Sequence, residues 1–404
     1  MREMRSRGTR GAGLGIYQYL ITVAWHQFFC YYFFLLFFTF FLSPFWGQST
    51  WSAITYKQSD SNLKNGRLSL ASILFTAGAD AKRPKGIYIH SLQTRTFSRA
   101  IFLPNNCSNV RVSPTGNSVA FSIGKDQNGG PGLFVAFKKD DKWTWLKLYD
   151  QFVIEHEFSP DGNALVFVGG PVRRDIYVAY SPDWVPKPTT DTADRMESQP
   201  SWLADGSGLL YVTHNAELGG TPDRICIWHF TTMKESEIYH DPLFSVGSPR
   251  QGSPGGHIAF TKWGAKQSPE AEKQTAYICL VPPEGGKAQT LTNLVSWEGS
   301  LRWSADGKWI SIIGADNTLK LLQRRGKLFL INPISGEVHK LGERVDSYCW
   351  LPDGLHIVLS QGAPGNRRLV LFNLQSEKKQ SVGFKDRDSY GPQYWIRQNI
   401  FKEE

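Results

Sequence analysis

Short apolar runs separated by turn residues recur along most of this chain. In the clearest copy, the turn Ser159-Pro-Asp-Gly162 is followed by an apolar run from Ala164 to Val168 and by a second apolar segment, Ile176 to Val178. Gly adopts positive φ without steric cost, which suits a tight turn. Short runs rich in β-branched and aromatic residues favour buried strands over helices. The unit therefore predicts a strand, a turn and two further strands.

The same pattern occurs five more times. Each copy has a turn followed by an apolar run, and the turns are Ser113-Pro-Thr-Gly116, Leu203-Ala-Asp-Gly206, Ser253-Pro-Gly-Gly256, Ser304-Ala-Asp-Gly307 and Leu351-Pro-Asp-Gly354. A third strand follows each time, and a weaker fourth strand usually ends the unit. The period is roughly 41–52 residues, the range expected for four-stranded propeller blades. Six complete blades are therefore predicted.

A seventh blade is divided between the two ends of the repeat region. Ile73 to Thr76 matches a second strand, Ile87 to Ile89 a third and Thr96 to Phe102 a fourth, and no first strand precedes them. Tyr390 to Trp395 resembles the first strand Ser198 to Trp202 and has no second strand after it. Closing the ring removes a long open sheet edge. We therefore expect an all-β, seven-bladed β-propeller closed by the C-terminal strand.

The beginning of the chain differs in composition. Arginines precede a stretch without charged residues that ends at Lys57, and Phe28 to Trp46 is almost wholly apolar. About 20 such residues span a bilayer, with the arginines on the cytoplasmic side. Gly47-Gln-Ser49 also suits signal-peptide cleavage. We expect residues 1–49 to be a transmembrane anchor helix or a signal peptide, 50–65 a linker, and 66–404 a propeller in the periplasm or outside the cell.

The repeat resembles a known family. Ser159-Pro-Asp-Gly162, Val166-Phe167 and Asp175-Ile-Tyr-Val178 resemble the TolB-like repeat, a WD40-like (PD40-type) propeller repeat, and the resemblance covers about residues 66 to 396. It implies the propeller fold and no particular activity, because propellers host many functions. Peptidases with similar propellers carry a Gly-x-Ser-x-Gly elbow in a hydrolase domain, which this sequence lacks. Peptidase activity is therefore not expected.

The turn carboxylates and the channel strands offer little catalytic chemistry. Asp161 and its counterparts in the other turns are expected to bond their own backbone. Glu155 and His156 lie in a predicted first strand, where a ligand role at the channel is an alternative to packing. Exported seven-bladed propellers include polysaccharide lyases that use a metal ion and histidines in the channel, but the first strands here show no histidine cluster. We assign no catalytic residue, no metal and no cofactor.

The loops joining second to third strands are rich in Lys and Arg, in a chain of net charge +9. Ten of these residues are candidate binding residues, which we call the basic loop face: Lys82, Arg83, Lys85, Arg173, Arg174, Lys320, Arg324, Arg325, Arg367 and Arg368. The same loops also contain Arg224, Lys262 and Lys327. Clustered charge attracts anionic partners, and arginine suits carboxylate and phosphate contacts. The alternative is that these charges only keep the loops solvated.

Together these patterns predict an exported, membrane-tethered propeller that acts as a protein-interaction or ligand-binding module. The expected partner at the basic loop face is a protein, an anionic glycan or a lipid headgroup, and not nucleic acid. The alternative is an extracytoplasmic glycan-active lyase or hydrolase on the same scaffold. That alternative requires acid, base or metal ligands that converge in the channel.

Overall fold

The computed structural model describes residues 71–396 except for short internal segments. These segments are 79–84, 93, 125–129, 140–141, 171–173, 193, 216–222, 265–275, 297–299, 316–325 and 385–387. The regular secondary-structure elements of the described residues are all strands. These residues contain no helix that is long and apolar enough to cross a membrane. The predicted anchor or signal peptide and the linker lie outside the described residues.

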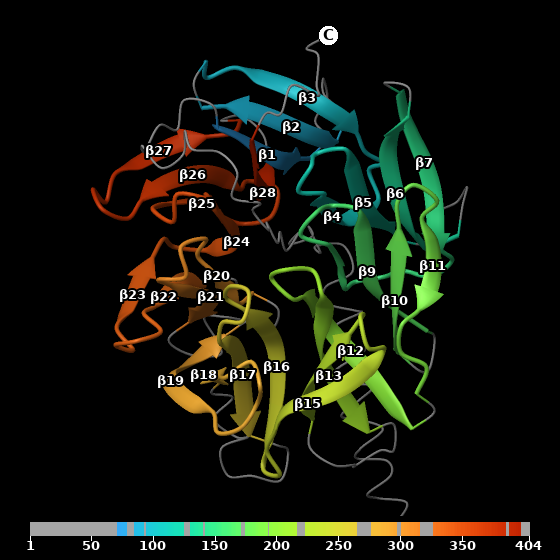
Figure 1. Ribbon diagram of the computed structural model, residues 1–404. Coiled ribbons are helices and arrows are strands. Elements are labelled where there is room, and N and C mark those ends of the chain that lie inside the picture. The colour runs from blue at the N-terminus through green and yellow to red at the C-terminus, as the bar shows by residue number, and fades with distance from the viewer. Residues whose placement is uncertain are drawn as a thin grey trace, which may run out of the picture. The chain divides into compact units, whose positions relative to one another are not determined.

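The strands form seven antiparallel blades arranged radially, as predicted (Figure 1). The first blade contains β28 (Ser389–Ile396), β1 (Ala71–Ala77), β2 (Gly86–Ser91) and β3 (Phe97–Phe102). The second contains β4 (Cys107–Val112), β5 (Ser118–Ile123), β6 (Gly132–Lys139) and β7 (Lys142–Tyr149). The third contains β8 (His156–Phe158), β9 (Ala164–Gly169), β10 (Asp175–Tyr180) and β11 (Val185–Pro188).

The remaining four blades keep the same order, with the strand nearest the axis first in the chain. The fourth contains β12 (Arg195–Trp202), β13 (Gly208–Asn215), β14 (Arg224–His229) and β15 (Lys234–His240). The fifth and sixth contain β16 (Phe244–Gln251), β17 (Ile258–Gly264), β18 (Ala276–Val281), β19 (Gln289–Ser296), β20 (Arg302–Trp303), β21 (Ile310–Ala315), β22 (Lys327–Ile331) and β23 (Val338–Leu341). The seventh contains β24 (Val345–Trp350), β25 (His356–Gln361), β26 (Arg368–Asn373) and β27 (Lys379–Val382). β19 also pairs with β21, which joins the fifth and sixth blades into one sheet.

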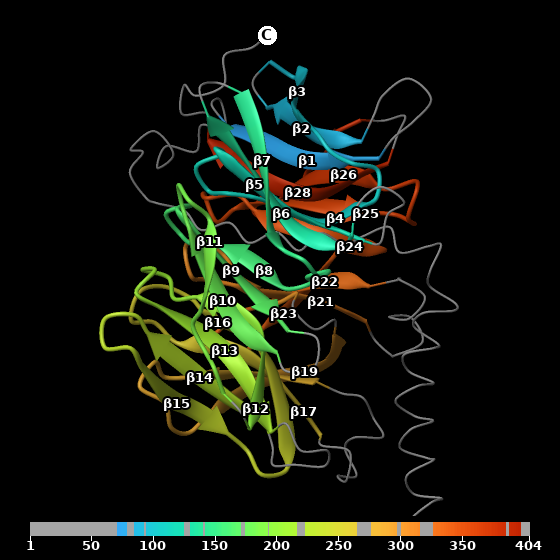
Figure 2. The same ribbon diagram turned by 90° about the vertical axis from the view of Figure 1, so that its right-hand side faces the viewer.

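β28 is hydrogen-bonded to β1 although the two strands lie at opposite ends of the described chain. Their register places Ile73 opposite Tyr394, and they lie side by side in both views (Figure 1, Figure 2). The side chain of Gln393 also reaches the second blade. Its Oε1 accepts a hydrogen bond from the Val112 N–H at 2.8 Å, and its Nε2 donates to the Val110 carbonyl at 3.4 Å.

Four of the innermost strands share a β-bulge at the same position. The bulge residues Asn109, Gln199, Ser248 and Gly391 have φ of 49°, 53°, 53° and 55°, and the strand register shifts at each of them. A bulge of this kind bends the strand and increases its twist. The next residue is proline in three of the four strands, which explains why Tyr390 to Trp395 resembles Ser198 to Trp202 in sequence.

Apolar side chains pack between the blades. The described residues form seven buried clusters, and each cluster combines residues of two neighbouring blades. Phe121 and Leu74 join the second blade to the first, and Ile73 and Leu369 join the first blade to the seventh. Burying one such side chain contributes roughly 1.5–3 kcal/mol. The blades are therefore stabilised by their neighbours around the ring.

The predicted role of the turn carboxylates is confirmed. Asp161 Oδ1 accepts a hydrogen bond from the Asn163 N–H at 3.0 Å, and Asp205, Asp306 and Asp353 make the same contact with the N–H two residues further on. These carboxylates hold the turns between first and second strands. They do not converge on a common site.

Candidate functional site

The structure places two members of the basic loop face in the interior. Lys85 is 6% exposed, and its Nζ donates to the carbonyls of Cys107 at 2.7 Å and Asn105 at 3.2 Å. Arg367 is 1% exposed and lies between two carboxylates. Their assignment to an exposed binding face is therefore corrected. Arg174 is exposed and Arg368 is half-buried, while the other six lie outside the described residues: Lys82, Arg83, Arg173, Lys320, Arg324 and Arg325.

Carboxylates from other parts of the blades compensate several cations of the same loops. The described ion pairs are Arg224–Glu237 at 3.5 Å, Lys262–Asp241 at 3.4 Å and Lys327–Glu343 at 3.0 Å. These acidic residues lie in or next to outer strands and in connections between blades. A count restricted to the loops between second and third strands leaves them out. The described part of this face is therefore less basic than the loop sequences indicate.

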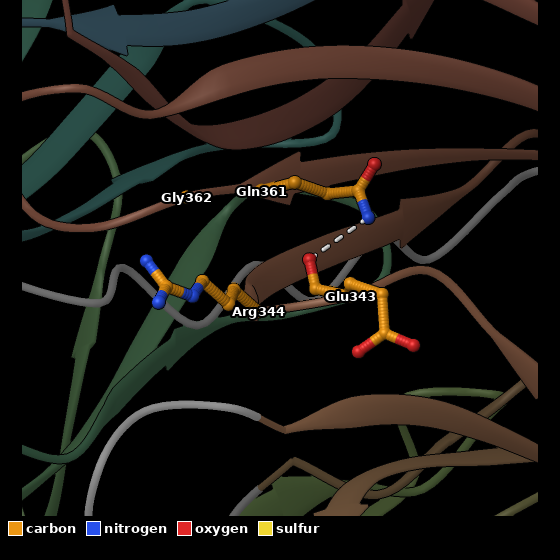
Figure 3. A pocket seen from close by; sticks show the side chains of 4 residues that line it. All are labelled: Glu343, Arg344, Gln361 and Gly362. Atoms are coloured by element: carbon orange, nitrogen blue, oxygen red, sulfur yellow. Dashed lines mark hydrogen bonds between the residues drawn. The ribbon is translucent and has the colours of Figure 1, made fainter.

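A shallow pocket lies on the seventh blade, at the end where the second strand β25 leads into the loop to β26. It is lined by Glu343, Arg344, Gln361 and Gly362, and Gln361 Nε2 donates to the Glu343 carbonyl at 3.0 Å (Figure 3). The side chain of Arg344 points away from the Glu343 carboxylate. Glu343 and Arg344 are exposed and carry opposite charges. The Glu343 carboxylate pairs with Lys327 Nζ at 3.0 Å, so the pocket does not present a carboxylate without a partner.

A different cluster of charge lies on the innermost strands, around the central channel. Four charged residues occupy equivalent positions on the first strands of their blades: Arg111 on β4, Glu157 on β8, Arg250 on β16 and Arg302 on β20. Each lies two residues before the residue that begins the turn, whose N–H donates a hydrogen bond to the start of the second strand. We call these four residues the channel arginine site. The fourth blade has the small Ser201 at this position. Arg250 Nη2 lies 3.3 Å from Glu157 Oε2, so this ion pair joins the third and fifth blades.

The channel arginine site contains three cations and one carboxylate. Arg111 lies within electrostatic range of Arg302, Glu157 and Arg250, and Arg302 lies within range of Arg250 and Glu157. Burial, followed by the neighbouring arginines, lowers the pKa of Arg111 and lowers the pKa of Arg302 to about 10. Arginine stays protonated in proteins, so these side chains are cationic.

Two N–H groups of this site have no acceptor among the described residues. Arg111 Nη1 and Arg250 Nε are buried and unpaired, whereas Arg302 Nη1 donates to the Leu301 carbonyl at 2.7 Å. A buried charge without a partner costs several kcal/mol. Guanidinium groups bind carboxylate or phosphate through paired N–H···O contacts. The arrangement therefore suits an anion in the channel.

The predicted channel residues Glu155 and His156 have different environments. His156 is 5% exposed, and neither ring nitrogen has a hydrogen-bond partner in the described part of the chain. Burial, and then the nearby Arg111, lower its pKa to about 3, so the ring is neutral. Glu155 accepts a hydrogen bond from the Gln199 N–H, and burial raises its pKa. Within the described ranges, no group of three or more His, Cys, Asp and Glu side chains is placed to hold a metal ion.

Stability should fall in acid because of His156. The pKa of a free imidazole is 6.5, so the unfolded chain takes up a proton below that pH, whereas the folded chain takes it up only near pH 3. The free energy of unfolding should therefore decrease by about 2 kcal/mol between pH 7 and pH 5 from this group. Leu301 holds the equivalent place in the sixth blade, so His156→Leu should remove this part of the pH dependence. Urea unfolding of both proteins at pH 7 and pH 5 measures the difference, and equal pH dependence would contradict the assignment.

Sequence reasoning missed the channel arginine site, although a signal was present. Aligning the six complete copies on their turns places Arg111, Arg250 and Arg302 in one column, with Glu157 in the same column. The loop charges hid this signal, because they are more numerous. The alternation of polar and apolar residues also did not show which side chains of these strands face the channel. The extra residue of the bulge shifts the alternation by one position.

Comparison with known proteins identifies the fold. The sequence matches no protein-family model and no curated protein. The structure is similar to an oligogalacturonate lyase in complex with manganese, with a TM-score of 0.55 and 14% identity over 78% of this chain and 85% of the lyase. It is also similar to a putative 6-phosphogluconolactonase from Bacteroides uniformis (TM-score 0.50, 12% identity, 81% and 99% of the two chains). TolB from Acinetobacter baumannii aligns with a TM-score of 0.48 and 13% identity over 84% and 86%. At these identities, the similarity to the lyase and to the putative lactonase establishes a β-propeller fold and no specific activity.

Proposed function

We propose that this propeller is a binding module that takes an anionic ligand in its central channel. The observation that carries the proposal is that Arg111 Nη1 and Arg250 Nε are buried without an acceptor in the described part of the channel arginine site. The Glu157 carboxylate already pairs with Arg250 Nη2. An anionic ligand would give acceptors to both nitrogens. The ligand class is therefore a compound with carboxylate or phosphate groups.

The proposal retains an extracytoplasmic location and a membrane tether, which rest on the apolar N-terminal sequence. In that setting the ligand would be an acidic glycan or an acidic segment of a partner protein. The exposed Arg174 and the remaining cations of the basic loop face would attract such a ligand towards the channel mouth. Long-range attraction of this kind affects the association rate more than the final affinity.

Replacing the channel arginines should produce opposite effects on binding and on stability. Arg111→Met together with Arg302→Met should weaken binding of digalacturonate, citrate or inorganic phosphate at least tenfold, because charge-assisted contacts are lost. The same change should leave stability unchanged or raise it by about 1–4 kcal/mol, because buried like charges are removed. Calorimetric titration and urea unfolding of the full-length protein measure the two effects.

Arg174→Gln is the matched control for charge outside the channel. It should change the salt dependence of the association rate and leave the affinity within about twofold. Unchanged affinity in the double methionine variant would contradict the channel site. Strong loss of affinity in Arg174→Gln alone would instead favour the loop face.

A glycan-active enzyme remains the second candidate, since the channel contains charged groups and not only apolar and amide side chains. The same titrations can distinguish it. If digalacturonate is consumed with the formation of an unsaturated product, measured by ultraviolet absorbance, the function is a lyase. If it is bound and recovered intact, the function is binding.

A further inference from the structure

Three side chains of the fourth blade form a hydrogen-bonded chain that sequence reasoning did not find. Ser198 Oγ lies 2.7 Å from His214 Nε2, and His214 Nδ1 lies 2.7 Å from Asp223 Oδ1. Ser198 is on β12, His214 is on β13 and Asp223 directly precedes β14. The same atoms, in the same order, connect nucleophile, base and carboxylate in serine hydrolases. We call these residues the Ser–His–Asp chain.

The environment of Asp223 and His214 fixes the direction of the proton path. Asp223 Oδ2 also accepts a hydrogen bond from the Val246 N–H of the fifth blade at 3.4 Å, and the Asp223 side chain is only 15% exposed. A carboxylate accepts the proton of Nδ1, so the other ring nitrogen is left as an acceptor for the Ser198 hydroxyl. His214 can therefore act as a general base towards Ser198.

Ser198 lies next to the strained bulge on the innermost strand. The following residue, Gln199, has a φ of 53°, and its N–H donates to Glu155 Oε2. In many serine hydrolases the N–H of the residue after the nucleophile stabilises the oxyanion of the tetrahedral intermediate. Here the carboxylate of Glu155 holds that N–H. Glu155 is also within electrostatic range of His214, Arg174 and Arg250, so it lies between the Ser–His–Asp chain and the channel arginine site.

We propose that Ser198 is a nucleophile for ester hydrolysis, activated by His214 and Asp223, and that Glu155 closes the site by occupying the oxyanion donor of Gln199. This activity goes beyond the proposed binding function. Displacement of the Glu155 carboxylate, by a ligand or by substitution, would release the Gln199 N–H. During ester hydrolysis, the oxyanion of the tetrahedral intermediate would then accept the hydrogen bond of the Gln199 N–H in place of the Glu155 carboxylate.

The reaction proceeds in two balanced steps. Ser198 Oγ attacks the ester carbonyl carbon while its proton passes to His214 Nε2, and the alcohol leaves with that proton when the carbon–oxygen bond breaks. Water then attacks the acyl-serine, gives its proton to His214, and the acid is released as Ser198 recovers the proton. Ser198 is 4% exposed, so side chains around it must move to admit a substrate, and a small acyl group needs the least movement. The expected substrates are esters of short acids such as acetate.

A fluorophosphonate probe tests the nucleophile without knowledge of the substrate. Ser198 Oγ would displace fluoride from phosphorus, with its proton passing through His214, and leave one phosphonyl group on the protein. The full-length chain is incubated with the probe, and intact mass and peptide mapping locate the label. We expect a label on Ser198, a labelling rate at least 100-fold lower in His214→Gln and a reduced rate in Asp223→Asn, because general base catalysis contributes about 10²–10⁴-fold.

The role of Glu155 is tested in the same assay. Glu155→Ala should increase the labelling rate at Ser198 at least tenfold, and it should raise hydrolysis of p-nitrophenyl acetate by the same factor. Ser236 is the matched control, because its Oγ is 2.9 Å from His229 Nε2 in the same blade. Ser236→Ala should leave labelling unchanged.

Each outcome decides between the alternatives. Labelling of Ser198 that depends on His214 and increases in Glu155→Ala supports the whole proposal. Equal labelling in Glu155→Ala and the unmodified chain overturns the closing role of Glu155. Labelling that is independent of His214, or no label on Ser198 in either protein while circular dichroism shows a folded chain, overturns the nucleophile and leaves the Ser–His–Asp chain as a packing feature.

Discussion

Deleting residues 389–404 is expected to leave a chain that no longer folds cooperatively. The deletion removes β28, which pairs with β1 from Ala71 to Ala77, and so it exposes an unpaired edge in the first blade. It also removes the bonds of Gln393 to Val110 and Val112 of the second blade. A typical domain is stable by only about 5–15 kcal/mol in total. Loss of a whole innermost strand should exceed that margin.

The measurement is urea unfolding followed by tryptophan fluorescence and by circular dichroism. We expect a broad transition, or none, and aggregation at concentrations where the full chain is soluble. A chain that lacks only residues 397–404 isolates the contribution of β28, and a synthetic peptide of residues 389–396 added in trans should restore part of the transition by strand addition. A sharp transition with an unchanged midpoint in the larger deletion would show that the ring does not depend on closure by this strand.

The fold could be predicted because short sequence patterns determine each blade and because these patterns recur in every blade. Each blade needs a turn that tolerates positive φ at a glycine such as Gly162 and an apolar second strand that both neighbouring blades bury. Both requirements are visible within about 20 residues of sequence. The bulge at Gln199 and its counterparts was harder to predict, because glycine, asparagine, glutamine and serine all occupy it. The pairing of β19 with β21 depends on the contact between two blades and has no local signal.

The candidate sites could not be predicted to the same extent, because their parts come together only through the ring. Glu343 compensates Lys327 from a connection between blades, which a count over one set of loops does not include. Arg250 meets Glu157 across a blade whose own residue is the small Ser201. Ser198, His214 and Asp223 belong to no recognisable sequence motif. The register of β12 with β13 brings Ser198 near His214, and the pairing of β13 with β14 brings Asp223 near His214.

Arg367 and Arg368 form a pair in the sequence that the structure separates into two roles. The Arg367 guanidinium donates to Asp388 through Nη2 at 2.6 Å and Nε at 3.0 Å, and to Asp346 through Nη1 at 3.0 Å. It also lies 4.0 Å from the ring centre of Tyr390 in β28. Arg368 is half-buried and donates to the Arg367 carbonyl at 2.9 Å. The first arginine is internal structure, and only the second lies near the surface.

Arg367→Met should therefore lower the free energy of unfolding by about 3–5 kcal/mol, because Asp346 and Asp388 would remain buried without their shared cation. Arg368→Met is the matched control and should cost about 1 kcal/mol or less, because interactions of a partly exposed charge contribute little. Urea unfolding at neutral pH measures both changes. Adding Asp388→Asn to Arg367→Met should recover part of the loss, since one unpaired charge disappears, and a non-additive double-mutant cycle would show the coupling. Equal small effects of the two methionine substitutions would mean that Arg367 is solvated. A charge reversal at Arg367 would therefore break the ion pair that holds the seventh blade to the first, and it would not report on binding at the basic loop face.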